Sequence, residues 1–215
     1  MSSLEILSKK THHRVPVSCI SYIERQSQKI IVHTDNEDFI CYRKKMDEFE
    51  EELAPRGFLR INQSHLISSA RVVAFSKTFL SISGRFFPIS QKRQSYCFQY
   101  LEARHKGGMI TCYGGPYSRS HIYIMPERTV LIGQDSASAD LVINMRRISP
   151  HHLSICYHPK NKTYTLIDYS TSGTFIDGDQ MAANTPYSVQ PGCMVCLGRA
   201  SALYELGLAP EKKPQ

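Results

Sequence analysis

The chain has 215 residues, which is long enough for one large domain or two of ordinary size. Its formal net charge is +7, and the excess is uneven: residues 1–106 carry 17 Lys and Arg against 11 Asp and Glu, whereas residues 107–215 carry 9 against 8. The basic first half favours a polyanionic partner, and the absence of any run approaching ~20 apolar residues argues against a membrane-spanning helix.

The first half is predicted to combine strands with two helices, after an N-terminal extension over residues 1–14. Helical spacing places Met46, Phe49 and Leu53 on one face, and a proline and a glycine end that helix by residue 57. Ser90 is expected to cap a second helix, whose apolar residues recur at helical spacing. The predicted strands are Val15–Glu24, Lys29–His33, Glu37–Tyr42, Phe58–Ile61, His65–Ile67, Arg71–Phe75, Phe79–Ile82 and Arg85–Pro88.

This order of elements, with its polar loops, resembles the LytTR DNA-binding domain of bacterial transcription regulators. The resemblance rests on Tyr22–Glu24 (YIE), Phe58–Ile67 (FLRINQSHLI) and Ile82–Ser90 (ISGRFFPIS), and it covers about residues 15–103. It implies an antiparallel β domain with two helices, which we place at residues 15–104. It also implies that three loops enter successive grooves on one face of a DNA duplex.

The resemblance assigns the DNA contacts to these three loops. Cations and hydroxyls donate to phosphates, whereas Arg, Asn and Gln read base edges. Many relatives have a cation where this chain has Gln63 and Gln91. The loss of two phosphate contacts predicts that the slope of log K against log salt concentration is smaller by nearly two, at ~0.9 per phosphate. An amide can still read adenine, although ordinary solvated turns are the alternative. The expected contacts are Gln28, Lys29, Arg60, Asn62, Gln63, Ser64, Ser90, Gln91, Lys92 and Arg93.

A linker at residues 105–108 is followed by short strands separated by turns, which is typical of a β-sandwich. The segments Ile132–Gln134 (IGQ), Ile148–His152 (ISPHH) and Leu166–Gly178 (LIDYSTSGTFIDG) resemble the forkhead-associated (FHA) domain, a phosphothreonine-binding sandwich, over about residues 108–207. We place this domain at 109–208 and a disordered tail at 209–215. The predicted strands are Met109–Cys112, His121–Met125, Thr129–Ile132, Leu141–Ile143, Leu153–Tyr157, Tyr164–Asp168, Thr174–Ile176 and Met194–Leu197.

The expected phosphopeptide pocket departs from the family pattern. Ser149, Thr171 and the structural His152 are present, but Gln134 stands where the family has Arg and Ser172 where it has Asn. Losing one charged hydrogen bond, worth roughly 1.5–3 kcal/mol, predicts binding weaker by about 10- to 100-fold. Two arginines ahead of the serine could supply charge, so phosphopeptide binding and phosphate-independent protein contact both stay open. The expected partner-binding set is Gln134, Arg146, Arg147, Ser149, Thr171 and Ser172.

No cofactor, metal site or catalytic group is expected. The seven cysteines are odd in number and scattered, which is typical of a reducing cytoplasm, and the single C-x-x-C at Cys193 and Cys196 has no second pair. The histidine pairs at residues 12–13 and 151–152 have no cysteine or carboxylate partner at ligand spacing. Neither a nucleophile–base pattern nor a phosphate-binding glycine loop is visible.

Two hypotheses follow. The favoured one is a cytoplasmic bacterial transcription regulator that binds double-stranded DNA sequence-specifically as a homodimer, with the FHA-like domain supplying partner contact or dimerisation. The alternative is an FHA-type signalling adaptor that binds a phosphopeptide, with the basic half as a docking surface. Gel-shift titration with DNA and binding to a phosphothreonine peptide library discriminate between them.

Overall fold

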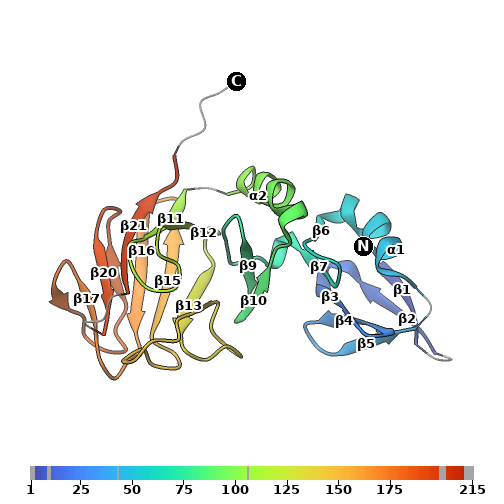
Figure 1. Cartoon of the computed structure of the whole chain (residues 1–215), viewed down its shortest axis with the longest axis horizontal. Helices are drawn as coiled ribbons and strands as arrows, with labels where there is room; N and C mark the ends of the chain where they lie inside the picture. Colours follow the sequence, from blue (N-terminus) through green and yellow to red (C-terminus); the bar gives the residue numbers. More distant parts are fainter. Residues whose placement is uncertain (1–2, 9–10, 43, 106, 199–201, 211–215) are drawn as a thin grey trace. The chain divides into compact units, whose positions relative to one another are not determined.

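The computed structural model describes residues 3–8, 11–42, 44–105, 107–198 and 202–210 of the chain. These residues form two compact units, one from the described parts of 1–71 and 88–99, the other from those of 72–87 and 100–215. Strands predominate, and the described residues include two α-helices, so the expected mainly β class is confirmed (Figure 1). Lys106 of the expected linker and residues 211–215 of the expected tail lie outside the described residues.

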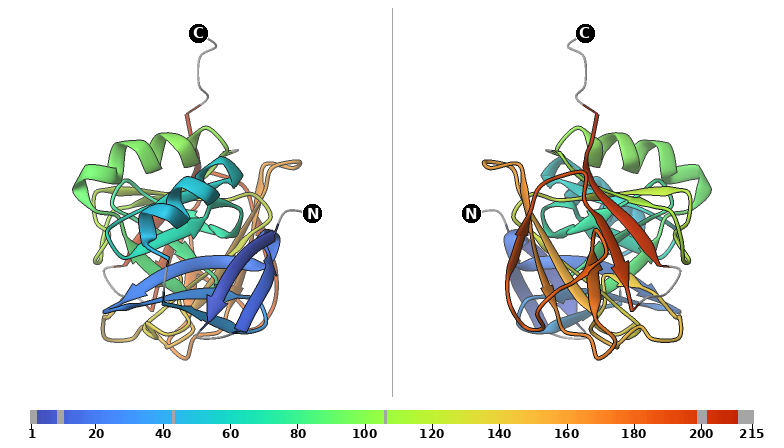
Figure 2. Two further views of the ribbon diagram at one scale, coloured as in Figure 1. Left: turned by 90° about the vertical axis from the view of Figure 1, so that its right-hand side faces the viewer. Right: turned by 90° about the vertical axis from the view of Figure 1, so that its left-hand side faces the viewer.

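The first unit is built on a five-stranded antiparallel sheet in the order β5-β4-β3-β7-β6. Helix α1 (Met46–Leu53) packs its predicted apolar residues into the same core as the sheet, and Figure 2, left, shows α1 lying over the strands. The strands are β3 (Ile20–Gln26), β4 (Lys29–Thr34), β5 (Asp38–Cys41), β6 (Phe58–Arg60) and β7 (His65–Ser68). The short helical turns are η1 (Val17–Cys19), η2 (Ala54–Arg56), η3 (Ser69–Arg71) and η4 (Gln91–Arg93), and α2 spans Gln94–Glu102.

A hairpin precedes this sheet where the sequence predicted only an extension. Strand β1 (Ser3–Ser8) pairs with β2 (Thr11–Pro16), and Leu4, Ile6 and Val15 are buried in the core of the first unit. The alternation of these apolar residues with polar neighbours is the period-two pattern of a half-buried strand. The single strand expected over residues 15–24 is therefore two strands, separated by η1 directly after Pro16.

The second unit is a sandwich of two sheets. Its nine-stranded sheet has the order β10-β9-β8-β12-β11-β21-β20-β17-β18, and its five-stranded sheet has the order β14-β13-β15-β16-β19. Apolar residues of both sheets meet in one core, which is the sandwich packing predicted for this half. The strands of this unit face the viewer in Figure 2, right. The strands are β11 (Gly108–Cys112), β12 (Ser120–Ile124), β13 (Thr129–Gly133), β14 (Leu141–Val142), β15 (Leu153–His158), β16 (Thr163–Asp168), β17 (Thr174–Ile176), β18 (Asp179–Gln180), β19 (Tyr187–Val189), β20 (Met194–Leu197) and β21 (Leu203–Leu208).

Three strands that the sequence analysis grouped with the first domain pack in this second unit: β8 (Ala74–Phe75), β9 (Phe79–Ile82) and β10 (Arg85–Pro88). Strand β8 pairs with β12, so Phe75 lies opposite Tyr123. At the β9–β10 turn, the Gly84 N–H donates to the Asp140 Oδ1 at 2.7 Å. Asp140 is buried, and its second oxygen accepts the Leu131 N–H at 2.9 Å, so one carboxylate joins this hairpin to β13.

Candidate nucleic-acid interface and phosphopeptide site

Three polar segments meet at one end of the five-stranded sheet of the first unit: the β3–β4 turn, the β6–β7 loop and the segment that enters η4. The Arg25 N–H donates to the Ser64 carbonyl at 2.8 Å, which joins the first segment to the second. The Ser90 N–H and its Oγ both donate to the Ile61 carbonyl, at 2.9 and 3.1 Å, which joins the second to the third. Antiparallel pairing of β3 with β7, together with the Ser90 hydrogen bonds, therefore holds three distant stretches of sequence side by side.

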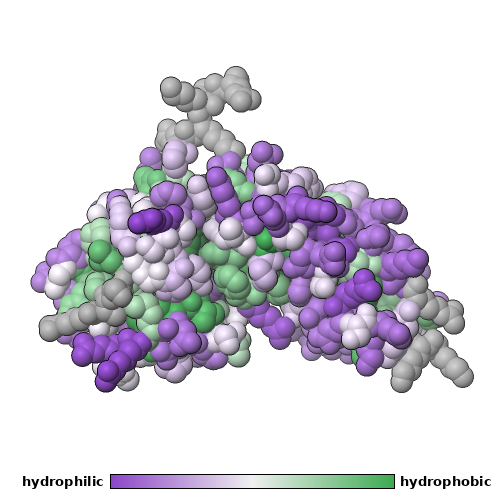
Figure 3. Space-filling view, in the orientation of Figure 1, coloured by the Kyte–Doolittle hydropathy of each residue, from purple (hydrophilic) through white to green (hydrophobic). Residues whose placement is uncertain are grey.

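A shallow groove of about 740 Å³ lies between the second and third segments. It brings together eight of the ten residues predicted to contact DNA and adds His65. Gln28, in the β3–β4 turn, and Lys29, the first residue of β4, lie outside its lining. In the face that Figure 3 shows, the surface of the first unit, on the right, is mainly hydrophilic. The lining residues are Arg60, Asn62, Gln63, Ser64, His65, Ser90, Gln91, Lys92 and Arg93.

Two of the predicted contacts have their polar groups engaged within the protein. The Asn62 Oδ1 accepts the backbone N–H groups of Ser64 and His65, both at 2.9 Å, and its Nδ2 donates to the Pro88 carbonyl at 3.0 Å. Arg60 is only 8% exposed and donates to the carbonyls of residues 62 and 63, at 2.6 and 2.7 Å. Both side chains therefore fix the loop from inside.

The side chains that do reach solvent are mostly amides and cations. Arg93 is half-buried, and its guanidinium donates to the Glu50 carboxylate at 3.0 Å. The exposed Arg25, at the end of β3, was not among the predicted contacts, although its charge in a polar turn was a usable signal. Burial lowers the pKa of His65 despite the nearby Glu24, which favours a neutral imidazole there. The exposed predicted residues are Gln28, Lys29, Gln63, Ser90, Gln91 and Lys92.

In the second unit, the predicted phosphopeptide residues come together where three loops meet. The Ser149 Oγ accepts the Thr171 N–H at 3.1 Å, and the two hydroxyl oxygens are 3.4 Å apart. The Gln134 N–H donates to the Ser149 carbonyl at 3.0 Å, so the loop after β13 is joined to the turn before β15. A fully buried His152 completes this turn by accepting the Ser149 N–H at 3.1 Å. Burial lowers the pKa of His152, which keeps that nitrogen free to accept.

The two residues that depart from the FHA pattern are used internally. The Gln134 Nε2 donates to the Met145 carbonyl at 2.6 Å, and the Ser172 Oγ donates to the Arg147 carbonyl at 2.5 Å. Both contacts tie loop to loop instead of offering donors to a ligand. Arg146 and Arg147 are exposed beside Ser149, and Arg147 has a φ of 72°, an uncommon conformation for a residue other than glycine. Charge at this site therefore comes from the arginines ahead of the serine.

The comparisons with known proteins give two family matches. The model of the LytTr DNA-binding domain matches residues 10–102, and the model of the FHA domain matches residues 130–198. No curated protein matches the chain. Among the described residues, none of the helices has the length and apolar character needed to cross a bilayer.

Solved structures of both kinds are similar to parts of the chain. A LytTr DNA-binding domain from Bacillus cereus is 23% identical, with 47% of this chain and 97% of that one covered and a TM-score of 0.42. An FHA domain from Chlamydia trachomatis is 19% identical, with 47% of this chain and 96% of that one covered and a TM-score of 0.42. An N-terminal FHA domain from S. cerevisiae, solved with a phosphothreonine peptide, is 18% identical, with 48% and 94% covered and a TM-score of 0.40. The chain is therefore similar to the LytTr DNA-binding domain over residues 10–102 and to the FHA domain over residues 130–198.

Proposed function

We propose that the chain is a bacterial transcription regulator that binds duplex DNA sequence-specifically through the polar segments at one end of the first unit. The observation that carries this proposal is the pair of hydrogen-bonded links, Arg25 to Ser64 and Ser90 to Ile61, that hold three exposed amide-bearing and cationic segments together. Such a rigid scaffold lowers the entropic cost of placing several donors against DNA at once.

The proposal divides the predicted residues by role. Exposed cations contact phosphates, because these groups donate without regard to sequence, whereas the Ser90 hydroxyl positions the third segment through its bond to the Ile61 carbonyl. The exposed Gln28, Gln63 and Gln91 amides read base edges, for which adenine is the matching purine. Arg60 and Asn62 position the loop, since Arg60 is buried and donates to two loop carbonyls, and the Asn62 amide is already hydrogen-bonded to backbone groups.

The second unit has the partner-binding role in this proposal. It contacts a protein partner or a second copy of the chain, and two copies then occupy paired half-sites on DNA. The internal hydrogen bond of Gln134 supports a pocket that depends little on phosphate. A cytoplasmic location, where DNA is accessible, belongs to the same proposal.

Charge reversal at two exposed lysines tests DNA binding. Lys29→Glu combined with Lys92→Glu is expected to weaken binding to duplex DNA at low salt. It is also expected to reduce the slope of log K against log salt concentration by nearly two, because each phosphate contact contributes ~0.9 to that slope. The measurement is fluorescence anisotropy with fragments selected from genomic DNA, titrated over a range of salt concentrations. Arg93 is left in place because its guanidinium pairs with Glu50.

Arg56→Glu is the matched control. This exposed arginine precedes β6 in the same unit, on the side away from the β6–β7 loop, and its Nη1 donates to the Ser3 carbonyl. It is expected to change binding much less than the double variant. Equal losses in both proteins, or no duplex binding by the unaltered chain at low salt, would contradict the proposed interface.

A second candidate function, a phosphopeptide-binding adaptor, is favoured by the Ser149–Thr171 contact beside two exposed arginines. Gln134→Arg restores the guanidinium of the family pattern and is expected to raise affinity for a phosphothreonine peptide by about 10- to 100-fold, since a charged hydrogen bond contributes roughly 1.5–3 kcal/mol. Gln190→Arg adds the same charge at an exposed position after β19 and serves as the control. Tight binding by the unaltered chain, lost with Ser149→Ala, would favour the adaptor.

A further inference from the structure

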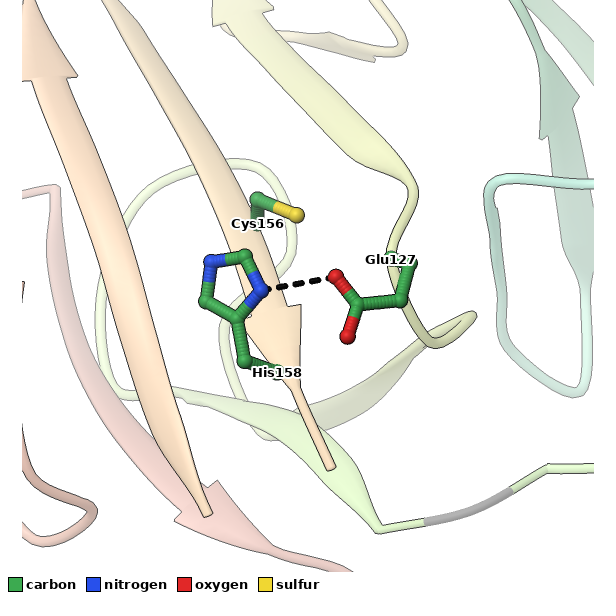
Figure 4. A group of neighbouring side chains, drawn as sticks. All are labelled: Glu127, Cys156 and His158. Carbon is green, nitrogen blue, oxygen red and sulfur yellow. Dashed lines mark hydrogen bonds and ion pairs between the residues drawn. The ribbon is translucent and has the colours of Figure 1, made fainter. Parts of the chain in front are cut away.

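Three potential metal ligands lie together on the second unit: Glu127, Cys156 and His158. Their ligand atoms are all within 4.8 Å of one another, and the side chains point toward a common centre in Figure 4. Among the residues that the structure describes, this is the one group of three His, Cys, Asp or Glu side chains with that spacing. It escaped the sequence analysis because Glu127 is distant from the other two along the chain.

The fold positions all three side chains. Cys156 and His158 are two residues apart on β15, so both point to the same face, while Tyr157 between them is buried in the core. Glu127 precedes β13, and its N–H donates to the Tyr157 carbonyl at 2.9 Å, which brings its carboxylate to this face. The cluster is thus fixed by a strand on one side and by a backbone hydrogen bond on the other.

The chemistry of the cluster suits a borderline-soft divalent cation. Thiolate, imidazole and carboxylate are the ligands that Zn²⁺ takes in proteins. The His158 Nδ1 lies 2.7 Å from the Glu127 Oε2, and its Nε2 lies 2.9 Å from the Thr165 Oγ1. A ligating histidine is usually held in this way by a partner on its second ring nitrogen. Burial, and then the Glu127 carboxylate, raise the pKa of the Cys156 thiol, so it stays protonated until a cation displaces the proton.

We propose that Glu127, Cys156 and His158 form a binding site for Zn²⁺ or a similar divalent cation, with a fourth position open to water or another ligand. On binding, the thiol proton leaves to solvent, and the imidazole proton that faces the Glu127 carboxylate moves from Nδ1 to Nε2 by exchange with solvent, where it donates to the Thr165 Oγ1. The site lies at the far end of β15 from the Ser149 turn, about 17 Å along the strand at ~3.3 Å per residue. It is therefore separate from the phosphopeptide residues.

Cobalt titration of the full, metal-free chain tests this site. Co²⁺ is expected to give the thiolate-to-cobalt charge-transfer absorption of a Cys-ligated site, and an equivalent of Zn²⁺ is expected to bleach it. Cys156→Ser is expected to abolish the band, while Cys19→Ser, at a half-buried cysteine of the first unit, is expected to keep it. No charge-transfer band in the unaltered chain, or a band that persists in Cys156→Ser, overturns the proposal.

Two gentler variants keep the test decisive if Cys156→Ser folds poorly. Thr165→Val removes the partner of the His158 Nε2 and is expected to weaken Zn²⁺ binding about 10-fold or more, as loss of such outer partners typically does. Glu127→Gln changes an exposed side chain and is expected to weaken binding at least as much. Thermal unfolding without metal identifies any variant that is misfolded, and unchanged Zn²⁺ affinity in both well-folded variants overturns the site.

Discussion

Asn62→Ala is expected to destabilise the first unit by about 2–3 kcal/mol and to weaken binding to every DNA sequence. The Asn62 side chain accepts two backbone N–H groups and donates to the Pro88 carbonyl, so alanine leaves three backbone groups without this partner. Each lost hydrogen bond contributes about 0.5–1.5 kcal/mol, and more where the freed group stays buried. The measurements are urea unfolding and anisotropy with both selected and scrambled duplexes.

Gln63→Ala is the matched control because it removes the neighbouring amide, which is exposed. It is expected to leave the free energy of unfolding within about 0.5 kcal/mol of the original value and to reduce discrimination between selected and scrambled DNA. The pair of variants separates a residue that positions the loop from one that reads bases. The opposite pattern, with Asn62→Ala stable but unselective, would return Asn62 to the base-reading role that the sequence suggested.

Much of the fold could be predicted because its signals are local. The apolar face of α1 follows helical spacing, and the strands β4, β9, β13 and β17 lie within a residue or so of their expected bounds. The two strands expected at 79–82 and 85–88 leave only Ser83 and Gly84 between them, and both residues have the positive φ that a two-residue hairpin turn requires. Family motifs, which depend on order and spacing, placed both modules.

The remainder depends on contacts between distant residues. The pairing of β8 with β12, and the Gly84–Asp140 bond beside it, have no local signature, so strands β8 to β10 could not be assigned to the sheet of the second unit from sequence. Strand β21 was missed although it pairs with β11 and β20, since a short alternating run near the end of the chain has few neighbours to support it. Pairing partners, unlike periodicity, are set by the whole fold.

The candidate site shows the same division at the level of side chains. Sequence reasoning identified the loop that contains residues 60–64, because polar residues interrupt an apolar run there. It could not tell Asn62, which turns inward to three backbone partners, from Gln63, which is exposed. Likewise, Gln134 was identified as a lost charge but not as a bridge to the Met145 carbonyl. The direction of a side chain depends on tertiary contacts that a pattern of residue types does not contain.

Gly133→Ala is expected to destabilise the second unit by about 3 kcal/mol or more, corresponding to a fall of about 10 °C in its melting temperature. A Cβ at this position would lie 1.9 Å from the Pro150 carbonyl oxygen and 2.7 Å from its carbon, both backbone atoms. The loop has little freedom to move away, because the Gln134 and Asp135 N–H groups donate to the carbonyls of Ser149 and Pro150. Calorimetry of the full chain measures the effect.

Gly207→Ala is the appropriate comparison, since a Cβ there would meet only ordinary contacts, the nearest at 3.9 Å. Removing backbone freedom from the unfolded chain at such a position is neutral or stabilising by about 0.4–1 kcal/mol. Binding of the partner is expected to weaken as the second unit is destabilised, because Gly133 lies against the turn that contains Ser149 and His152. A Gly133→Ala protein as stable as Gly207→Ala would mean that the Pro150 turn can shift, and that the loops of the second unit are not held as rigidly as their hydrogen bonds indicate.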